Sequence, residues 1–173
     1  MKKISITVLP EFYDRYINET DDLDLSEVLE SYGVNLINED KDKLISIGNQ
    51  VYETDKWTVK DILQHLIDCE RIFCYRALRI ARNDKTPLPG FNENEYIPEA
   101  RTERRTIDDL LYELDSVRST SILLFNSFDD EMLLRAGICS GKNISVLAIG
   151  FTIAGHMLHH INVIKEKYFP LLC

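Results

Sequence analysis

Three of the four histidines in this 173-residue chain, His156, His159 and His160, lie within five residues of one another. On a helix, His156 and His160 are about 40° apart around the axis, so their imidazoles project from adjacent turns of one face and can share a metal ion. His159 points about 60° away from His156 and about 100° from His160, which makes it the weaker ligand candidate. It could instead orient the site, contact substrate or lie at the rim.

The fourth histidine, His65, lies on a different segment, near the edge of an apolar stripe with helical spacing. Two histidines four residues apart are by themselves a weak signal, because such a pair often packs in a core. Together, His65, His156 and His160 could cap a metal ion from one side and leave other coordination positions open to water or substrate, as in a catalytic site. Imidazole suits zinc, nickel, iron and copper alike, so the sequence predicts a divalent transition metal without choosing among them.

Three residues near His65 are further candidates. Cys69 follows it by four residues on the same face and could add a thiolate, although a small buried hydrophobic role is the commoner one for such a cysteine. Asp68, three residues after His65, could accept a hydrogen bond from an imidazole or be an exposed helix acid. Arg76 projects within about 20° of the direction of His65, three turns further on, and could meet an anionic substrate.

These residues must be positioned by helices, because apolar residues recur at spacings of three and four along most of the chain. Two predicted helices open with a threonine followed three residues later by an acid, at Thr58 and Thr106, which caps free backbone N–H groups. The first predicted helix is interrupted near Gly33. The expected helices cover residues 23–47, 58–82, 106–125 and 145–169, with a shorter helix at 11–17. The inward stripe of the first comprises Leu25, Val28, Leu29, Tyr32, Leu36, Leu44 and Ile47.

Four helices of this length predict an all-α, four-helix bundle. The connection from Asn83 to Arg105 has 23 residues with three prolines, too long for a tight hairpin and long enough to cross the length of the bundle. The second and third helices could therefore run parallel. With no internal repeat and no linker, we expect residues 1–173 to form a single domain.

The charge of the chain is unevenly placed. Acidic residues outnumber basic ones 29 to 20, a net charge of −9, and the stretch from Glu11 to Asp42 alone holds 11 acids and 2 bases. This balance argues against a nucleic-acid partner. The 22 residues from Asn143 to Ile164 carry no charge and could span a bilayer by length, but three histidines and two asparagines indicate a core helix and no membrane partner.

Other sequence signals narrow the class of protein. No glycine motif of a dinucleotide fold or a P-loop is present. The four cysteines form no C-x-x-C pair, and residues 1–9 are too short for a signal peptide, so the simplest interpretation is a reduced, cytoplasmic protein. The cysteines are Cys69, Cys74, Cys139 and Cys173.

From about Tyr52 to Tyr168 the sequence resembles the DinB/YfiT-like superfamily of metal-dependent proteins and thiol-dependent S-transferases. Each matching segment is a weak signal by itself, and together they are fairly specific. The segments are Lys56-Trp57-Thr58-Val59-Lys60 leading to His65-Leu66, then Tyr75 to Arg82, Pro87-Leu88-Pro89-Gly90-Phe91, Glu113 to Arg118, and Gly155-His156-Met157-Leu158-His159-His160.

The resemblance implies an up-down-down-up four-helix bundle, a divalent ion held by His65, His156 and His160, and a homodimer. It also implies an enzyme that uses a low-molecular-weight thiol, such as mycothiol, bacillithiol or glutathione, to attack or isomerise a small electrophile. Our first hypothesis is therefore a metal-dependent thiol S-transferase or detoxification enzyme. The alternatives are a metal-dependent hydrolase in which bound water is the nucleophile, and a stress-linked binding or scaffolding protein that keeps a metal without turnover.

Overall fold

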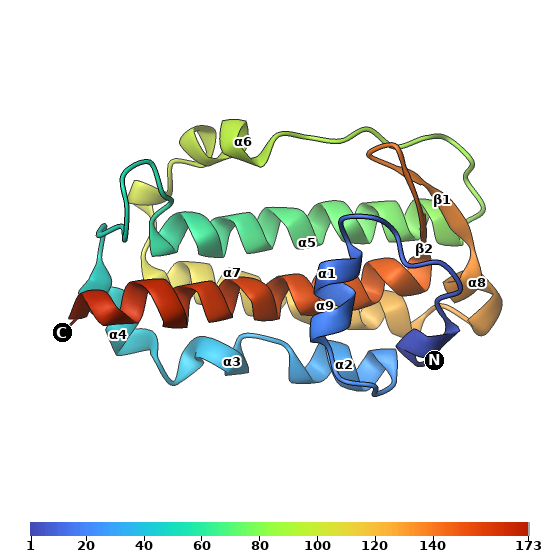
Figure 1. Ribbon diagram of the computed structural model, residues 1–173, viewed down its shortest axis with the longest axis horizontal. Helices are drawn as coiled ribbons and strands as arrows, with labels where there is room; N and C mark the ends of the chain where they lie inside the picture. Colours follow the sequence, from blue (N-terminus) through green and yellow to red (C-terminus); the bar gives the residue numbers. More distant parts are fainter. Residues whose placement is uncertain (173) are drawn as a thin grey trace.

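The computed structural model describes residues 1–172, most of which lie in helices packed side by side (Figure 1). Three long helices form most of the bundle, and a row of short helices forms its fourth member. The long helices are α5 (Val59–Ala81), α7 (Ile107–Asn126) and α9 (Val146–Val163); the row is α2 (Leu25–Ser31), α3 (Asn35–Asn38) and α4 (Lys41–Ile47). The four-helix bundle predicted from the sequence is the observed architecture.

Helices α5 and α7 begin as their sequences predict. The Thr58 hydroxyl accepts the backbone N–H of Asp61, whose carboxylate accepts the N–H of Thr58 in return. Thr106 and Asp109 repeat this capping box at the start of α7. Each box satisfies backbone donors that the first turn of a helix leaves free, which sets the start of both helices.

The first predicted helix is broken twice, around residues 32–34 and 39–40, where the sequence predicted one interruption near Gly33. The first break has a physical cause outside the segment. Arg118 of α7 donates hydrogen bonds to the carbonyl oxygens of Leu29 and Tyr32, which a continuing helix would use itself. The predicted stripe still faces inward, with Leu36 the one member that is only partly buried.

Cross-contacts give the directions of the long helices. Along α5 and α7 the residue numbers of contacting pairs increase together, from Gln64 with Arg105 to Cys74 with Ser121. The two helices therefore run in the same direction. Between α5 and α9 the order reverses. Trp57, just before α5, accepts a hydrogen bond from Tyr168, which follows α9, whereas His65 further along α5 contacts His156 in α9. The return path between α5 and α7 lies along the outside of the bundle (Figure 1).

That return path contains α6 (Glu93–Ala100), where the sequence predicts only a connection. A two-stranded antiparallel hairpin of β1 (Ala136–Cys139) and β2 (Lys142–Ser145), which was also not predicted, lies at the end of the bundle. Ser140 and Gly141 turn it with φ of 51° and 77°, the backbone of a tight two-residue turn. Leu88 of the return path exchanges backbone hydrogen bonds with Ile138 and Ser140, so the hairpin and the return path form one wall.

Helix α1 (Asp14–Glu19) crosses over α9, in place of the helix expected at 11–17. Gly155 allows the close approach, because a Cβ at that position would lie 1.9 Å from the carbonyl oxygen of Tyr16. The remaining short segments are η1 (Lys3–Ser5), η2 (Thr102–Arg104), α8 (Asp130–Leu134), η3 (Ile164–Tyr168) and η4 (Phe169–Leu172).

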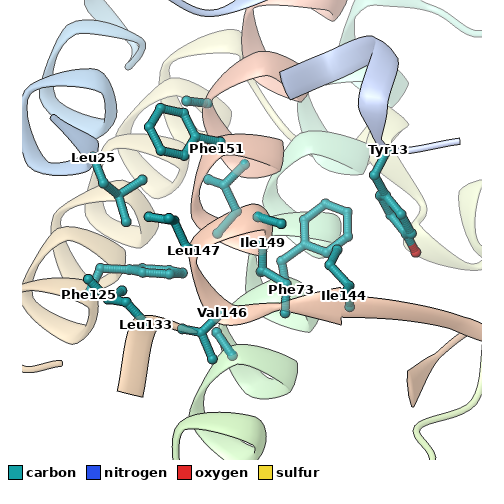
Figure 2. Packing of buried hydrophobic residues seen from close by; sticks show 14 of the residues in the cluster. Tyr13, Leu25, Phe73, Phe125, Leu133, Ile144, Val146, Leu147, Ile149 and Phe151 are labelled. Carbon is teal, nitrogen blue, oxygen red and sulfur yellow. The ribbon is translucent and has the colours of Figure 1, made fainter. Parts of the chain in front are cut away.

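Helix α9 is the centre of the core. Figure 2 shows Leu147 between Leu25 and Phe125, with Phe73 and Ile144 near Ile149 on another side of the helix. The stretch Val146–Leu172 is long and apolar enough to cross a membrane, but 72% of its most apolar part is buried inside the fold. Such burial is expected of the core helix of a soluble protein, as the sequence predicted.

Candidate metal centre

The structure brings three of the predicted ligands together. His65 on α5 and His160 on α9 each place Nε2 3.1 Å from Nε2 of His156, which lies between them. The rings of His65 and His160 also approach one another, with centroids 4.9 Å apart. Two nitrogens bound to one tetrahedral zinc ion lie about 3.3 Å apart, so the spacing of His156 from each neighbour suits ligands of a common ion. Within residues 1–172, the group whose ligand atoms all lie within 4.8 Å of one another is His65, Cys69 and His156.

The chemistry of these nitrogens also fits an ion. In a neutral imidazole, Nε2 carries either one hydrogen or one in-plane lone pair, and in either case it can form a straight hydrogen bond in only one direction. His156 Nε2 therefore cannot make two straight hydrogen bonds, to His65 and to His160, at the same time. A cation held by His65, His156 and His160 would use the lone pair of each.

Burial keeps the three imidazoles neutral. It lowers the pKa of His65 from its usual 6.5 to about 4 and that of His160 to about 3. Burial, followed by the charges of the other imidazoles, holds the pKa of His156 well below its usual value. Metal ions bind the neutral form of histidine, so near neutral pH a proton would compete little for these positions.

Cys69 lies against His65 as the sequence predicted, and its Sγ is within 4.8 Å of the ligand nitrogens of His65 and His156. Its distances to the two ring nitrogens of His65 are similar, 3.5 Å to Nδ1 and 3.7 Å to Nε2. The sulfur therefore lies beside the ring rather than along the lone pair of Nε2. Burial raises the pKa of the Cys69 thiol to about 12, so in this environment it is protonated.

The three histidines lie in the wall of a cavity of about 570 Å³, a size typical of small-molecule sites. Aromatic rings enclose them: Trp57 is 4.8 Å from His65 and Tyr16 is 5.0 Å from His156, between ring centroids. Phe73 is 5.9 Å from His156. The site is therefore shielded by apolar surface on several sides but open to a ligand.

The other predicted candidates divide between the cavity and its surroundings. His159 lies at the rim, 37% exposed, with Nδ1 3.4 Å from a carboxylate oxygen of Glu19. Asp68 lies apart from the imidazoles, because it accepts a hydrogen bond from Gln64 at 2.9 Å instead of from His65. Arg76 reaches the cavity but lies at its other end, beside the hairpin.

Sequence reasoning missed several residues of the cavity wall. Arg15 and Tyr16 come from α1, whose approach to α9 depends on the fold and leaves no local pattern. Glu93 comes from the return path, where its spacing from other acids does not single it out. Its charge raises the pKa of Tyr16 and Cys69 and partly offsets the lowering of the His65 pKa by burial. Trp57, directly before the Thr58 cap of α5, is the one of these residues whose place in the cavity wall the sequence could have indicated.

Comparison with known proteins agrees with this fold. The chain matches the family model of the DinB superfamily over residues 17–164. Among solved structures it is similar to YfiT from Bacillus subtilis, described as a probable metal-dependent hydrolase with an unusual four-helix bundle topology. The TM-score is 0.66 at 17% identity, over 83% of this chain and 87% of that chain, which shows a shared fold. Curated protein sequences give no match.

Proposed function

We propose that this chain, which belongs to the DinB superfamily, is a metal-dependent enzyme that transfers the sulfur of a low-molecular-weight thiol to an electrophilic small molecule. The metal ligands in this proposal are His65, His156 and His160. The observation that supports them is the convergence of three neutral imidazoles, with 3.1 Å between Nε2 of His156 and Nε2 of each neighbour, in the wall of a cavity.

A divalent transition metal bound there, such as zinc, nickel or iron, would supply a Lewis acid that favours the thiolate form of a thiol or polarises a carbonyl oxygen. The residues of the chain do the rest. Trp57 and Tyr16 pack their rings against His65 and His156 and so hold two imidazoles in place. These rings also limit the access of water to the reacting groups, which strengthens electrostatic interactions inside the cavity.

Two features favour a thiol as the nucleophile. The cavity of about 570 Å³ can hold a small thiol together with a small electrophile. Among residues 1–172, no carboxylate forms a hydrogen bond with His65, His156 or His160, so no side-chain base is fixed beside the imidazoles. A thiol needs such a base less than water does, because its pKa is far lower.

A metal-dependent hydrolase is the second candidate. Glu93 lies in the cavity wall and its charge acts on His65 and Cys69, so it could serve as the general base that attack by water requires. The description of YfiT as a probable metal-dependent hydrolase supports the same candidate.

Metal content and turnover, measured together, test the proposal. We expect purified protein to hold one divalent ion per chain, His156→Ala to lose it, and the rim variant His159→Ala to keep it. Equal metal content in all three proteins would reject the site. We expect conjugation of 1-chloro-2,4-dinitrobenzene only with an added thiol, tested with mycothiol, bacillithiol and glutathione.

The remaining outcomes separate the alternatives. Cleavage of a p-nitrophenyl ester without thiol, lost in His156→Ala and in Glu93→Gln, would favour the hydrolase. A bound ion without either activity would favour a stress-linked binding or scaffolding protein that keeps a metal.

The proposal includes a homodimer in the reducing cytoplasm, where the free thiols of Cys69, Cys74 and Cys139 would stay reduced. Light scattering coupled to size-exclusion chromatography would test the dimer. A mass near 20.1 kDa, that of one chain, would show a monomer instead.

A further inference from the structure

Arg76 is a buried charge without a charged partner. Its side chain is only 4% exposed, yet among residues 1–172 it forms no ion pair with a carboxylate. Its two hydrogen bonds, both from Nη2, go to neutral acceptors: the carbonyl oxygen of Pro89 at 2.8 Å and the hydroxyl of Ser140 at 3.0 Å. Burial of an ion without a counter-charge is costly, so this arrangement needs an explanation.

The free donors of Arg76 face the cavity. Nε and Nη1 make no hydrogen bond with residues 1–172, and no fully buried side-chain nitrogen or oxygen in this part of the chain lacks a partner. These two nitrogens therefore keep some exposed surface, and we assign it to the cavity, which Arg76 lines. The Phe91 ring, centred 5.9 Å from the guanidinium carbon, and the Ser140 hydroxyl in the hairpin turn contact the side chain, and both residues also line the cavity.

The wall of this cavity has an excess of positive charge. Arg15, Arg76 and Lys142 line it, against the acids Glu11 and Glu93. Lys142 and Glu11 pair with one another, whereas Arg15 donates to the Tyr16 hydroxyl. A divalent ion at the histidines would add to this excess, so the cavity as a whole favours an anionic ligand.

Arg76 and His65 lie on one face of α5. His65, Cys69, Phe73 and Arg76 follow each other at spacings of three and four residues, and all line the cavity. The Cα atoms of His65 and Arg76 are about 16 Å apart along the helix axis. A ligand that touches both ends must be an elongated small molecule.

We propose that Arg76 binds a carboxylate of the substrate, so that the enzyme selects elongated, partly apolar molecules with an anionic group at one end. The aromatic walls would contact the middle of such a molecule, and the histidine end would receive its reacting group. Only this last point rests on the proposed function. The assignment of Arg76 follows from its burial, its neutral partners and its free donors.

Binding of two ligands of equal shape tests the proposal. We would titrate the full-length metal-loaded protein with 4-phenylbutyrate and with 4-phenylbutyramide by calorimetry. The emission of Trp57, the one tryptophan of the chain, would show that each ligand enters this cavity. We expect the carboxylate to bind about tenfold more tightly or better, as charged hydrogen bonds imply. Equal affinities in the wild-type protein would overturn the proposal without any variant.

Variants then place the preference at Arg76. We expect Arg76→Gln to bind the acid and the amide equally and Arg76→Lys to keep part of the preference. Arg82→Gln, at an exposed position directly after the same helix, should keep all of it. Circular dichroism would confirm that each variant is folded. If Arg76→Gln does not fold, Arg76→Lys alone decides, because an unreduced preference in that variant would contradict recognition by the guanidinium.

The same titrations after removal of metal by a chelator separate this inference from the proposed function. A preference that survives in Arg76→Gln but disappears without metal would place the carboxylate on the ion and overturn our assignment. A preference that follows Arg76 after chelation would support the assignment, and the same result in a protein that also binds no added zinc would reject the metal-dependent enzyme alone. Full metal content with no preference would reject the assignment alone.

Discussion

A buried arginine lies on each of two sides of α5, Arg118 from α7 on one and Arg76 from α5 itself on the other, and the two differ in what surrounds the charge. Toward α7, Arg118 is 3% exposed and donates two hydrogen bonds of 2.8 Å to the carboxylate of Glu70. It also donates to the backbone carbonyls of Leu29 and Tyr32. Toward the cavity, Arg76 is as deeply buried but finds only neutral acceptors.

The polar groups beside each arginine repeat the contrast. On the α7 side, Cys74 donates to Ser121, whose hydroxyl donates to the carbonyl oxygen of Val117. On the cavity side, the three imidazoles have each other as nearest polar neighbours. Polar groups that satisfy one another hold a structure together, whereas polar groups gathered without full partners mark a place for a ligand.

Stability of matched variants is the strongest test of this contrast. Arg118→Met leaves the Glu70 carboxylate buried without its partner, so we expect a loss of about 3–5 kcal/mol in the free energy of unfolding. Arg76→Met leaves no carboxylate unpaired, and both of its acceptors, at Pro89 and Ser140, lie on exposed residues. We expect its effect to be about 1 kcal/mol or less. Urea denaturation measures both.

The control for this pair is the double variant Glu70→Gln/Arg118→Met, which removes the orphaned charge and should recover part of the loss. An equal loss in Arg76→Met and Arg118→Met would show that Arg76 is a structural residue and would remove the contrast.

Acid should lower the free energy of unfolding through the buried histidines of the cavity. The pKa of His65 is about 4 in the folded protein and 6.5 when unfolded, so above pH 6.5 both states are neutral and this group adds no pH dependence. As pH falls below 6.5, the unfolded chain takes up a proton that the folded chain does not, so stability falls until about pH 4. For His65 alone the loss is on the order of 3 kcal/mol, and His160, with a pKa of about 3, extends it further down.

Urea unfolding of chelator-treated protein between pH 7.5 and 4 measures this effect. The matched variant His65→Gln cannot take up the proton, so its stability should fall less steeply over the same range. Parallel pH profiles of the two proteins would contradict the prediction, because carboxylates contribute equally to both.

The contact between α1 and α9 gives a smaller effect. A Cβ at Gly155 would lie 1.9 Å from the backbone oxygen of Tyr16, which cannot move without its helix. We expect Gly155→Ala to cost about 1–3 kcal/mol and to expose the amides of α1 to hydrogen exchange. In Gly150→Ala, on the same helix, the new Cβ would lie 2.8 Å from the tip of Leu25 and 3.0 Å from the Phe125 ring.

Because the Leu25 side chain can rotate and alanine favours helix by about 1 kcal/mol over glycine, Gly150→Ala should be close to neutral and serves as the control. If Gly150→Ala is destabilised as much as Gly155→Ala, the effect belongs to α9 in general, and α1 is not specifically held over the cavity.

The sequence predicts features that lie within one helix better than features that depend on contacts between segments. Spacing and capping residues predicted α5 and α7, and the spacing of His156 and His160 predicted one shared face, because these features depend on a single helix. The break near Gly33 was predicted, but its cause, the hydrogen bonds from Arg118, and the cavity wall from α1 and Glu93 were missed. They depend on contacts between segments far apart in the chain, which local patterns do not carry.

Cys69 gives the smallest expected effect and separates two ligand sets. One set is His65, His156 and His160; the other replaces His160 by Cys69, whose sulfur is also within reach of both remaining histidines. Since the sulfur lies beside the His65 ring and its thiol is protonated, we expect Cys69→Ala to change zinc affinity by no more than about tenfold. His160→Ala should weaken it by more than about a hundredfold. Competition with a chromophoric chelator measures both, and the opposite order would assign the thiolate as a ligand and close a position that a substrate needs.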